Sequence, residues 1–160
     1  MSHAIVKAQR EATSVSVVFL DLDRFKAIND SFGHNAGDTL LRVLAERMLR
    51  CVRETDTVAR LSGDEFVVLL DEERIGDQSR ALSIVERLQA TAAEPVSIAG
   101  HQVSVSCSIG VTSFPQDGTD PDALLINADL AMYRAKQRGR DAYNFYSEST
   151  KDGPKHSANA

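Results

Sequence analysis

The chain has 160 residues, of which 42% are hydrophobic and 26% charged, and its formal net charge is −5. This composition is typical of one soluble globular domain, and the negative charge argues against a broad nucleic-acid-binding surface, which must be basic. No apolar run approaches the ~20 residues of a membrane span, and no signal peptide is visible. Cys51 and Cys107 stand in apolar contexts without metal-ligand spacing, so we expect both to be reduced and buried in a cytoplasmic domain.

The first half of the sequence predicts a helix, a strand, a second helix and a β-hairpin. Residues 1–14 are typical of the end of a helix, and the β-branched run at residues 15–21 predicts a buried strand. A helix starting at Ala36 is predicted by apolar side chains at helical spacing, namely Leu40, Leu41, Leu44, Met48 and Val52. Residues 57–61 and 66–70 are two apolar runs around a tight turn, which predicts the hairpin.

The second half predicts two more helices with strands between and after them. In order, these elements are a helix ending before Pro95, a hairpin at residues 96–114, a helix at residues 121–139 with Gly139 as its C-cap, and a strand at residues 143–147. The first of these helices has apolar positions at Leu82, Val85 and Leu88.

This order mixes strands and helices, yet two of the connections are hairpins, so the sheet cannot be wholly parallel. We therefore expect an α+β fold of the palm or ferredoxin-like type, with a central, mostly antiparallel sheet of about five strands flanked by helices. The domain is expected to cover residues 1–148, and the polar residues 149–160 are expected to form a disordered tail.

Acidic residues stand at the ends of two predicted strands. Asp21 and Asp23 close the first strand with i, i+2 spacing, and Asp64 follows the hairpin turn. If the strand lies beside the hairpin, Asp21 and Asp64 converge, and Mg²⁺ would remove their repulsion, because it prefers carboxylates, waters and phosphates as ligands. Each acid alone is explained as well by a solvated strand end or turn, but the set at buried strands favours a metal site.

Polar residues between and after these acids are candidates for nucleotide contacts. Lys26 suits a phosphate. Asn29 and Asp38 could bind a base edge, because a carboxylate accepts from the two donors that guanine presents and adenine lacks. Lys136 and Arg140, at the end of the third helix, could hold a triphosphate. Each residue has an ordinary alternative: a surface lysine, a turn, a first-turn acid, or a cation that complements the helix dipole.

Three segments, "FLDLDRFKAINDSFGHNAGDTLL", "RLSGDEFVVLL" and "NADLAMYRAKQRGRDAYNF", together resemble the GGDEF domain, the catalytic module of diguanylate cyclases. The resemblance spans about residues 15–146 and depends on all three motifs in this order. It implies a palm-like fold related to nucleotide cyclases, with the signature motif on a β-hairpin. It also implies the condensation of two GTP molecules into cyclic di-GMP, with release of two pyrophosphates.

The resemblance implies roles for individual residues. Asp21, Asp64 and the backbone carbonyl of Leu22 would bind Mg²⁺, with Mn²⁺ as an alternative, and Glu65 would belong to the catalytic set without a defined role. The implied nucleotide contacts are Lys26, Lys136 and Arg140 for phosphate, Asn29 and Asp38 for guanine, and Gly63 for close backbone approach. Such sites act by positioning and electrostatics, and no convincing Ser/His or Cys/His nucleophile is present in the sequence.

A second motif, "RETD" at residues 53–56, ends five residues before the signature turn. In the family this RxxD spacing marks an inhibitory site for cyclic di-GMP, formed here by Arg53 and Asp56, and Arg87 resembles a further arginine of that site. A guanidinium fork suits phosphate and the Hoogsteen edge of guanine. Without the family context, an ordinary Arg-Asp pair after a helix would be the better explanation.

The sequence departs from the family at two places. Ser62 replaces the first glycine of the signature, and it would cost about 1 kcal/mol or more if this position required a positive φ. The usual opening of the first helix is absent, so residues 1–14 match only its tail, and we expect the chain to be a truncated piece. We expect an active enzyme whose activity is reduced by both departures.

The main hypothesis is therefore a Mg²⁺-dependent diguanylate cyclase that binds GTP, is inhibited by its product, and works as a homodimer because each subunit holds one GTP. The alternative is a catalytically silent module that binds GTP or cyclic di-GMP and regulates an attached domain. An adenylate-type cyclase is disfavoured by Asp38. We expect an attached sensory or phosphodiesterase domain in the native protein, and a cytoplasmic location, alone or as part of a larger membrane-attached protein.

Overall fold

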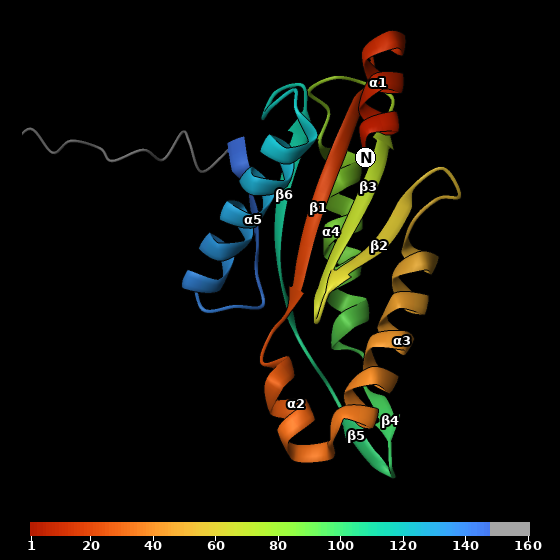
Figure 1. Ribbon diagram of the computed structural model, residues 1–160, viewed down its shortest axis with the longest axis vertical. Helices are drawn as coiled ribbons and strands as arrows, with labels where there is room; N and C mark the ends of the chain where they lie inside the picture. The colour runs from red at the N-terminus through yellow and green to blue at the C-terminus, as the bar shows by residue number, and fades with distance from the viewer. Residues whose placement is uncertain (148–160) are drawn as a thin grey trace, which may run out of the picture.

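A five-stranded sheet forms the centre of the computed structural model, which describes residues 1–147 (Figure 1). The strand order is β2-β3-β1-β6-β7, and neighbouring strands are antiparallel except for β6 and β7. The strands are β1 Ser14–Leu22, β2 Thr57–Ser62, β3 Glu65–Glu72, β6 Cys107–Phe114 and β7 Tyr143–Phe145. The predicted α+β class and mostly antiparallel sheet are confirmed, whereas the tail predicted for residues 149–160 lies outside the described residues.

Helices cover both faces of this sheet. Since the side chains of β1 alternate between the two faces, this strand is buried along its whole length. Val18 and Leu20 belong to a core that includes residues of α3 and α4. Val17 and Phe19 belong to a second core with α1 and α5. The helices are α1 Ser2–Glu11, α2 Phe25–Phe32, α3 His34–Cys51, α4 Ser79–Ala93 and α5 Pro121–Gln137. Asp21 continues the odd-numbered series, so its side chain emerges on the α5 side.

Helix α2 was not predicted. Its apolar residues Phe25, Ile28 and Phe32 follow the i, i+3, i+7 spacing of one helix face, so the signal for this eight-residue helix was present in the sequence, although only Phe25 is buried. Helix α3 then begins at His34, two residues before the predicted start. Gly33 separates the two helices with a φ of +89°, a conformation that glycine adopts without strain.

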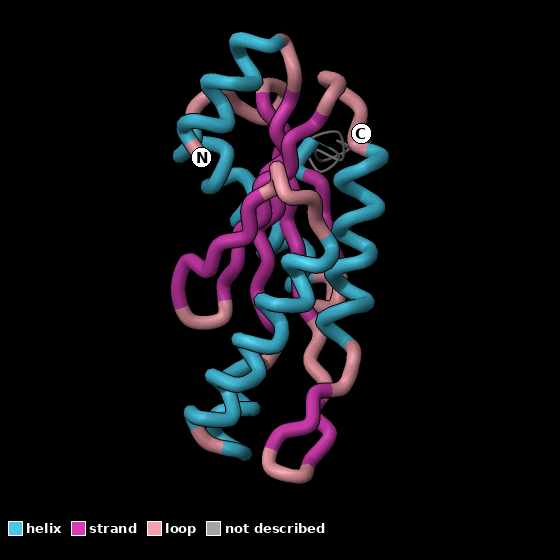
Figure 2. Tube along the Cα trace, turned by 90° about the vertical axis from the view of Figure 1, so that its right-hand side faces the viewer, coloured by secondary structure: helices cyan, strands magenta, loops and turns pink. Residues whose placement is uncertain are grey.

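The predicted hairpin at residues 96–114 is wrong in its second arm. Strands β4 (Val96–Ile98) and β5 (His101–Val103) form a separate two-stranded sheet around Ala99 and Gly100, which both have positive φ, as type I′ turns require. Strand β6 instead pairs with β1 and β7, because all its residues are buried and an interior position covers both of its faces. Figure 2 shows the β4–β5 hairpin projecting at the same end of the molecule as α2.

Helix α4 buries a slightly different stripe from the one predicted. Val85 and Leu88 are buried as expected, but the side chain of Leu82 is exposed. Ala81 and Ile84 take inward positions instead, and together with Val85 and Leu88 they form the i, i+3, i+4, i+7 pattern of one helix face. The buried face of α4 therefore includes the small side chain of Ala81 in place of the larger Leu82.

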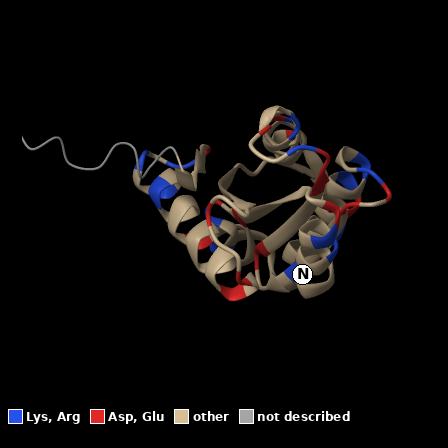
Figure 3. Cartoon of the chain, turned by 90° about the horizontal axis from the view of Figure 1, so that it is seen from above, with Lys and Arg blue, Asp and Glu red and all other residues tan. Residues whose placement is uncertain are grey.

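In Figure 3, which shows the cartoon from above, blue Lys and Arg segments and red Asp and Glu segments occur side by side on the helices and loops of that view. Both cysteines are buried and free, as predicted. Within residues 1–147, no helix combines the length and the apolar character needed to cross a membrane.

Candidate active site

The site predicted around Asp21 and Asp64 lies where β1 ends beside the signature hairpin. Strand β1 pairs with β3 so that Asp21 stands opposite Glu65, and the backbone N–H of Leu22 donates to the carbonyl oxygen of Asp64 at 3.2 Å. The carboxyl groups of Asp21 and Asp64 are close enough for Asp64 to raise the pKa of Asp21. The two acids that had to converge for a metal site therefore lie together.

The surroundings of Asp21 fit a divalent cation. Burial raises the pKa of this carboxyl to about 6; the ion pair with Lys136 opposes the rise, and the neighbouring carboxyl of Asp64 adds to it. The Oδ1 atom of Asp21 is buried and has no hydrogen-bond partner within residues 1–147. The unpaired oxygen of Asp21 and the neighbouring carboxylate of Asp64 are suitable ligands for Mg²⁺.

The protein side chains alone do not complete such a site. Among the described residues, no group of three or more His, Cys, Asp or Glu side chains could hold a metal ion. Backbone, water or phosphate oxygens would therefore have to supply the remaining ligands, which is the usual arrangement for Mg²⁺ bound with a nucleotide.

The signature turn accommodates serine without strain. Ser62 is the last residue of β2 and is not among the residues with positive φ, and its Oγ atom donates to Glu65 Oε2 at 3.2 Å. Gly63 has a φ of +49°, and a Cβ at this position would meet no atom within 4 Å. The backbone of the turn is thus open to a ligand, while Arg60 Nε donates to the Gly63 carbonyl at 2.7 Å and braces it. Arg60 was not among the predicted site residues, although a cation two residues before the turn was a usable signal.

Because Ser62 is unstrained, we expect the Ser62→Gly substitution to change the rate of the reaction that the resemblance implies, cyclic di-GMP formation, by no more than about threefold, the size of an ordinary surface substitution. Unfolding in urea should show a loss of roughly 0.5–1 kcal/mol, because glycine is less favourable in a strand. A rate increase of tenfold or more would show that the serine side chain obstructs the nucleotide.

The predicted base-reading residues lie on two adjacent helices. Asp38 is exposed near the start of α3 and lines a cavity of about 410 Å³. The other lining residues are Leu41, Arg42, Ala45, Leu49, Val58, Arg60 and Phe66. Asn29 lies on α2, and its Oδ1 atom packs against Gly37, one residue before Asp38. Lys26 is exposed on the first turn of α2.

The two predicted phosphate-binding cations after α5 occupy different places. Lys136 forms an ion pair with Asp21 and so belongs to the site around the acids. Arg140 is exposed, has a φ of +65°, and lines a separate cavity of about 350 Å³ together with Asp23 and Arg24. The structure brings Lys136 to the predicted metal ligands and leaves Arg140 at the neighbouring cavity.

Asp23 is a buried acid whose hydrogen bonds join separate elements of the fold. It is buried, and it accepts hydrogen bonds from the hydroxyl groups of Ser106 and Ser108, both at 2.7 Å, and from the backbone N–H of Asp141 at 3.0 Å. These bonds join the end of β1 to the start of β6 and to the segment after α5. Asp23 therefore supports the site by holding its elements together.

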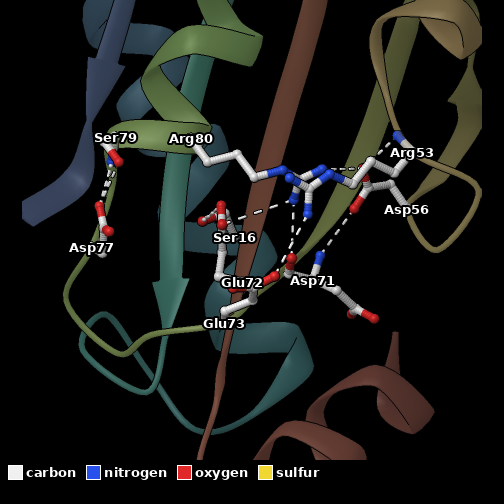
Figure 4. A network of polar contacts seen from close by, with 9 residues as sticks. All are labelled: Ser16, Arg53, Asp56, Asp71, Glu72, Glu73, Asp77, Ser79 and Arg80. Atoms are coloured by element: carbon white, nitrogen blue, oxygen red, sulfur yellow. Dashed lines mark hydrogen bonds and ion pairs between the residues drawn. The ribbon is translucent and has the colours of Figure 1, made fainter.

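Asp56 of the RxxD motif points into the protein (Figure 4). Its side chain is 0% exposed and accepts hydrogen bonds from the backbone N–H groups of Arg53 at 2.8 Å and Asp71 at 3.1 Å. The guanidinium group of Arg80, on α4, forms an ion pair with the same carboxylate. Arg80 also lies 3.8 Å from Glu72, a residue whose pKa is raised mainly by burial. Sequence reasoning missed Arg80, because nothing local relates a helix residue to a loop acid.

The two predicted arginines of the inhibitory site lie near the end of α3. Arg53 is exposed, with its Nη1 atom 3.9 Å from Glu73 Oε1, and it lines a cavity of about 240 Å³ together with Arg80. Arg87 donates from Nη1 to the carbonyl oxygen of Cys51 at 3.2 Å. Arg53 is thus open to a ligand, Arg87 is anchored to the helix end, and Asp56 lies beneath the surface.

The Asp56→Ala substitution should therefore destabilise the fold by about 3 kcal/mol, because it leaves Arg80 Nη2 and two backbone N–H groups without the acceptor they share. Urea-induced unfolding measures this loss. The matched control is Arg53→Ala, which keeps the backbone N–H and should change stability by less than about 0.5 kcal/mol. Equal stability of the two variants would contradict a structural role for Asp56.

Comparison with known proteins identifies the family of the chain. Residues 1–142 match the family described as diguanylate cyclase, GGDEF domain. The solved GGDEF domain of TpbB (YfiN) from Pseudomonas aeruginosa superimposes with a TM-score of 0.85 and 41% sequence identity, covering 90% of this chain and 89% of that one. The chain belongs to the GGDEF domain family.

Curated relatives are much longer proteins. MucR of P. aeruginosa, a bifunctional diguanylate cyclase/cyclic di-GMP phosphodiesterase, is 44% identical over 149 residues, which are 93% of this chain and 21% of MucR. The cyclic di-GMP phosphodiesterase NbdA of the same organism is 41% identical over 83% of this chain and 17% of its own length. The chain thus spans about a fifth of the length of these relatives, and one of them is named only for degrading cyclic di-GMP.

Proposed function

We propose that the protein is a diguanylate cyclase, which condenses two GTP molecules into cyclic di-GMP and releases two pyrophosphates. The observation that supports this most directly is the pair formed by Asp21 and Asp64, with a buried carboxylate oxygen that has no partner among the described residues. Bound at Asp21, Asp64 and the carbonyl of Leu22, Mg²⁺ or Mn²⁺ would make the attacking ribose 3′-hydroxyl more acidic and neutralise the leaving pyrophosphate.

Cations of the chain itself would hold the triphosphate. Lys136 neutralises Asp21 in the free protein, so its ammonium group already stands at the edge of the site. In the proposal it turns to a phosphate oxygen when substrate binds, while the exposed Lys26 and Arg140 contact the outer phosphates. The open turn at Gly63 lets the backbone approach the nucleotide.

Base selection would come from Asp38 and Asn29. A carboxylate accepts from the N1–H and the amino group of guanine together, but it would face the unprotonated N1 of adenine with repulsion. The partly apolar cavity beside Asp38 offers a place for a ring. ATP is therefore expected to be a poor substrate.

The reaction needs two copies of the chain, because the 3′-hydroxyl of one GTP attacks the α-phosphate of the other and each site holds one nucleotide. The proposal includes product inhibition, in which cyclic di-GMP binds through Arg53 with Arg87 and Asp56. Since Asp56 is already bound by Arg80, a ligand reaching this carboxylate would have to displace that arginine. Glu65, opposite Asp21 and bonded by Ser62, is proposed to support the catalytic acids.

The test is incubation of the chain with GTP and Mg²⁺, followed by chromatography of the products. Cyclic di-GMP should appear, and its rate of formation should rise more steeply than linearly with protein concentration. Replacing GTP by ATP should remove the product. Absence of cyclic di-GMP at all protein concentrations, with the chain folded, would contradict the enzymatic proposal.

A second candidate is a catalytically silent module that binds GTP or cyclic di-GMP and regulates an attached domain. The similarity to NbdA favours it, since a protein named only as a phosphodiesterase contains a matching region. Calorimetry separates the two: tight cyclic di-GMP binding without turnover of GTP supports the silent module, whereas turnover supports the cyclase.

A further inference from the structure

The contact between α2 and α3 has no room for a side chain at Gly37. A Cβ built on this buried residue would lie 1.9 Å from Asn29 Oδ1, 2.9 Å from Asn29 Cγ and 3.0 Å from Phe25 Cζ. Gly37 lies within α3 and does not have a positive φ. Its glycine is therefore required for space and not for backbone conformation.

The space above Gly37 is filled by the amide group of Asn29. The Oδ1 atom is buried there and has no hydrogen-bond partner within residues 1–147. A carbonyl oxygen is tolerated against the Cα–H group of a glycine, because the contact is weakly attractive, whereas an amide NH₂ in the same place would meet a second donor. Because Asn29 Oδ1 packs against Gly37, the Nδ2 end of the amide is the end that is left for a ligand.

We infer that Gly37 is a positioning residue for base recognition: having no side chain, it lets Asn29 seat its carbonyl oxygen on α3 and present its NH₂ group beside Asp38. This inference rests on the proposed function, in which these two residues contact guanine. A donor from Asn29 and an acceptor from Asp38 then match a purine edge that carries a ring acceptor next to two N–H donors. The Gly37→Ala substitution would displace the Asn29 amide from its position against α3 without changing the side chain of Asn29 or Asp38.

The inference is tested by calorimetric binding of two probes in the presence of Mg²⁺. One is 3′-deoxy-GTP, which carries the base but lacks the attacking hydroxyl, and the other is inorganic tripolyphosphate, which lacks the base. We expect Gly37→Ala and Asn29→Ala each to weaken 3′-deoxy-GTP about tenfold, the size of one lost hydrogen bond, and to leave tripolyphosphate binding within about twofold. Ser31→Ala, an exposed change on the same helix, is the matched control and should alter neither affinity.

The double variant separates positioning from simple helix packing. If Gly37 acts through Asn29, the pair Gly37→Ala/Asn29→Ala binds 3′-deoxy-GTP no more weakly than Asn29→Ala alone. Removing the Asn29 amide should also restore most of the melting temperature that Gly37→Ala loses. If Gly37→Ala alone does not fold, this rescue is the deciding measurement, and its absence would overturn the inference.

Two further outcomes are distinguishable. Unchanged 3′-deoxy-GTP affinity in Gly37→Ala, together with weakened affinity in Asn29→Ala, would overturn the positioning role and leave the proposed function standing. Failure of the unsubstituted chain to bind 3′-deoxy-GTP would overturn the proposed function and this inference with it.

Discussion

The Asp64→Ala variant should form cyclic di-GMP about 10³-fold more slowly than the unsubstituted chain, because it loses one of the two carboxylates that meet at the end of β1. The chromatographic GTP assay measures this loss. Glu54→Ala, which removes the same charge from an exposed loop position, is the matched control and should retain the full rate. Undiminished turnover in Asp64→Ala would remove the metal-binding role from the signature acid.

Without a bound metal, the Asp64→Ala substitution should reduce the loss of folding stability that occurs as the pH rises. The pKa of Asp21 is raised from 3.8 to about 6, first by burial and in part by Asp64. A raised pKa contributes stability that is fully present below the unfolded value and is lost as the pH rises through the folded value. The unsubstituted chain should therefore lose stability between pH 4 and pH 6 in the presence of a chelator. Asp64→Ala should lose less, and urea unfolding at both pH values checks the difference.

The Gly110→Ala variant should have the largest effect on folding, a loss of about 3 kcal/mol or more. A Cβ on this residue of β6 would lie 2.0 Å from the carbonyl oxygen of Ala128 and 2.3 Å from the amide nitrogen of Met132. Both atoms belong to the backbone of α5, so no side chain can turn aside, and the helix would have to move away from the sheet. Urea unfolding measures the loss.

Gly139→Ala is a suitable comparison, because a Cβ there meets no atom within 4 Å and only the positive φ of +111° opposes it. Its loss of stability should be clearly smaller than that of Gly110→Ala. If Gly110→Ala stays within about 1 kcal/mol of the unsubstituted chain, the close packing of α5 on β6 does not hold in solution. Because α5 also carries Lys136, a displaced helix should reduce cyclic di-GMP formation as well.

Several features of the fold were open to prediction from local patterns. The β-branched run of β1, the signature hairpin and the heptad-like apolar spacing of α3 each express a periodicity that a single segment contains. The meeting of Asp21 and Asp64 followed from two strand ends and one assumption about strand pairing, which the register of β1 on β3 confirms. Helix α2 was missed although Phe25, Ile28 and Phe32 express the helical period, because the segment has only eight residues, about two turns of helix.

Other features depend on pairs that are distant in the chain. The second arm of the predicted hairpin at residues 96–114 joins the central sheet instead, because β6 needs cover on both faces. Asp56 is predicted to bind a ligand, and the structure shows its carboxylate bound by Arg80 and by two backbone N–H groups. No local signal distinguishes an acid that faces a ligand from one that faces an arginine of another helix.

Short-range periodicity and composition were enough to predict the class of fold, the position of the signature turn and the residue types available for metal, phosphate and base. The ion pair of Lys136 with Asp21, the inward position of Asp56 and the room that Gly37 leaves for Asn29 became visible in the folded chain alone. Burial, ion pairing and steric room depend on atoms from separate elements, so they arise when the helices pack on the sheet.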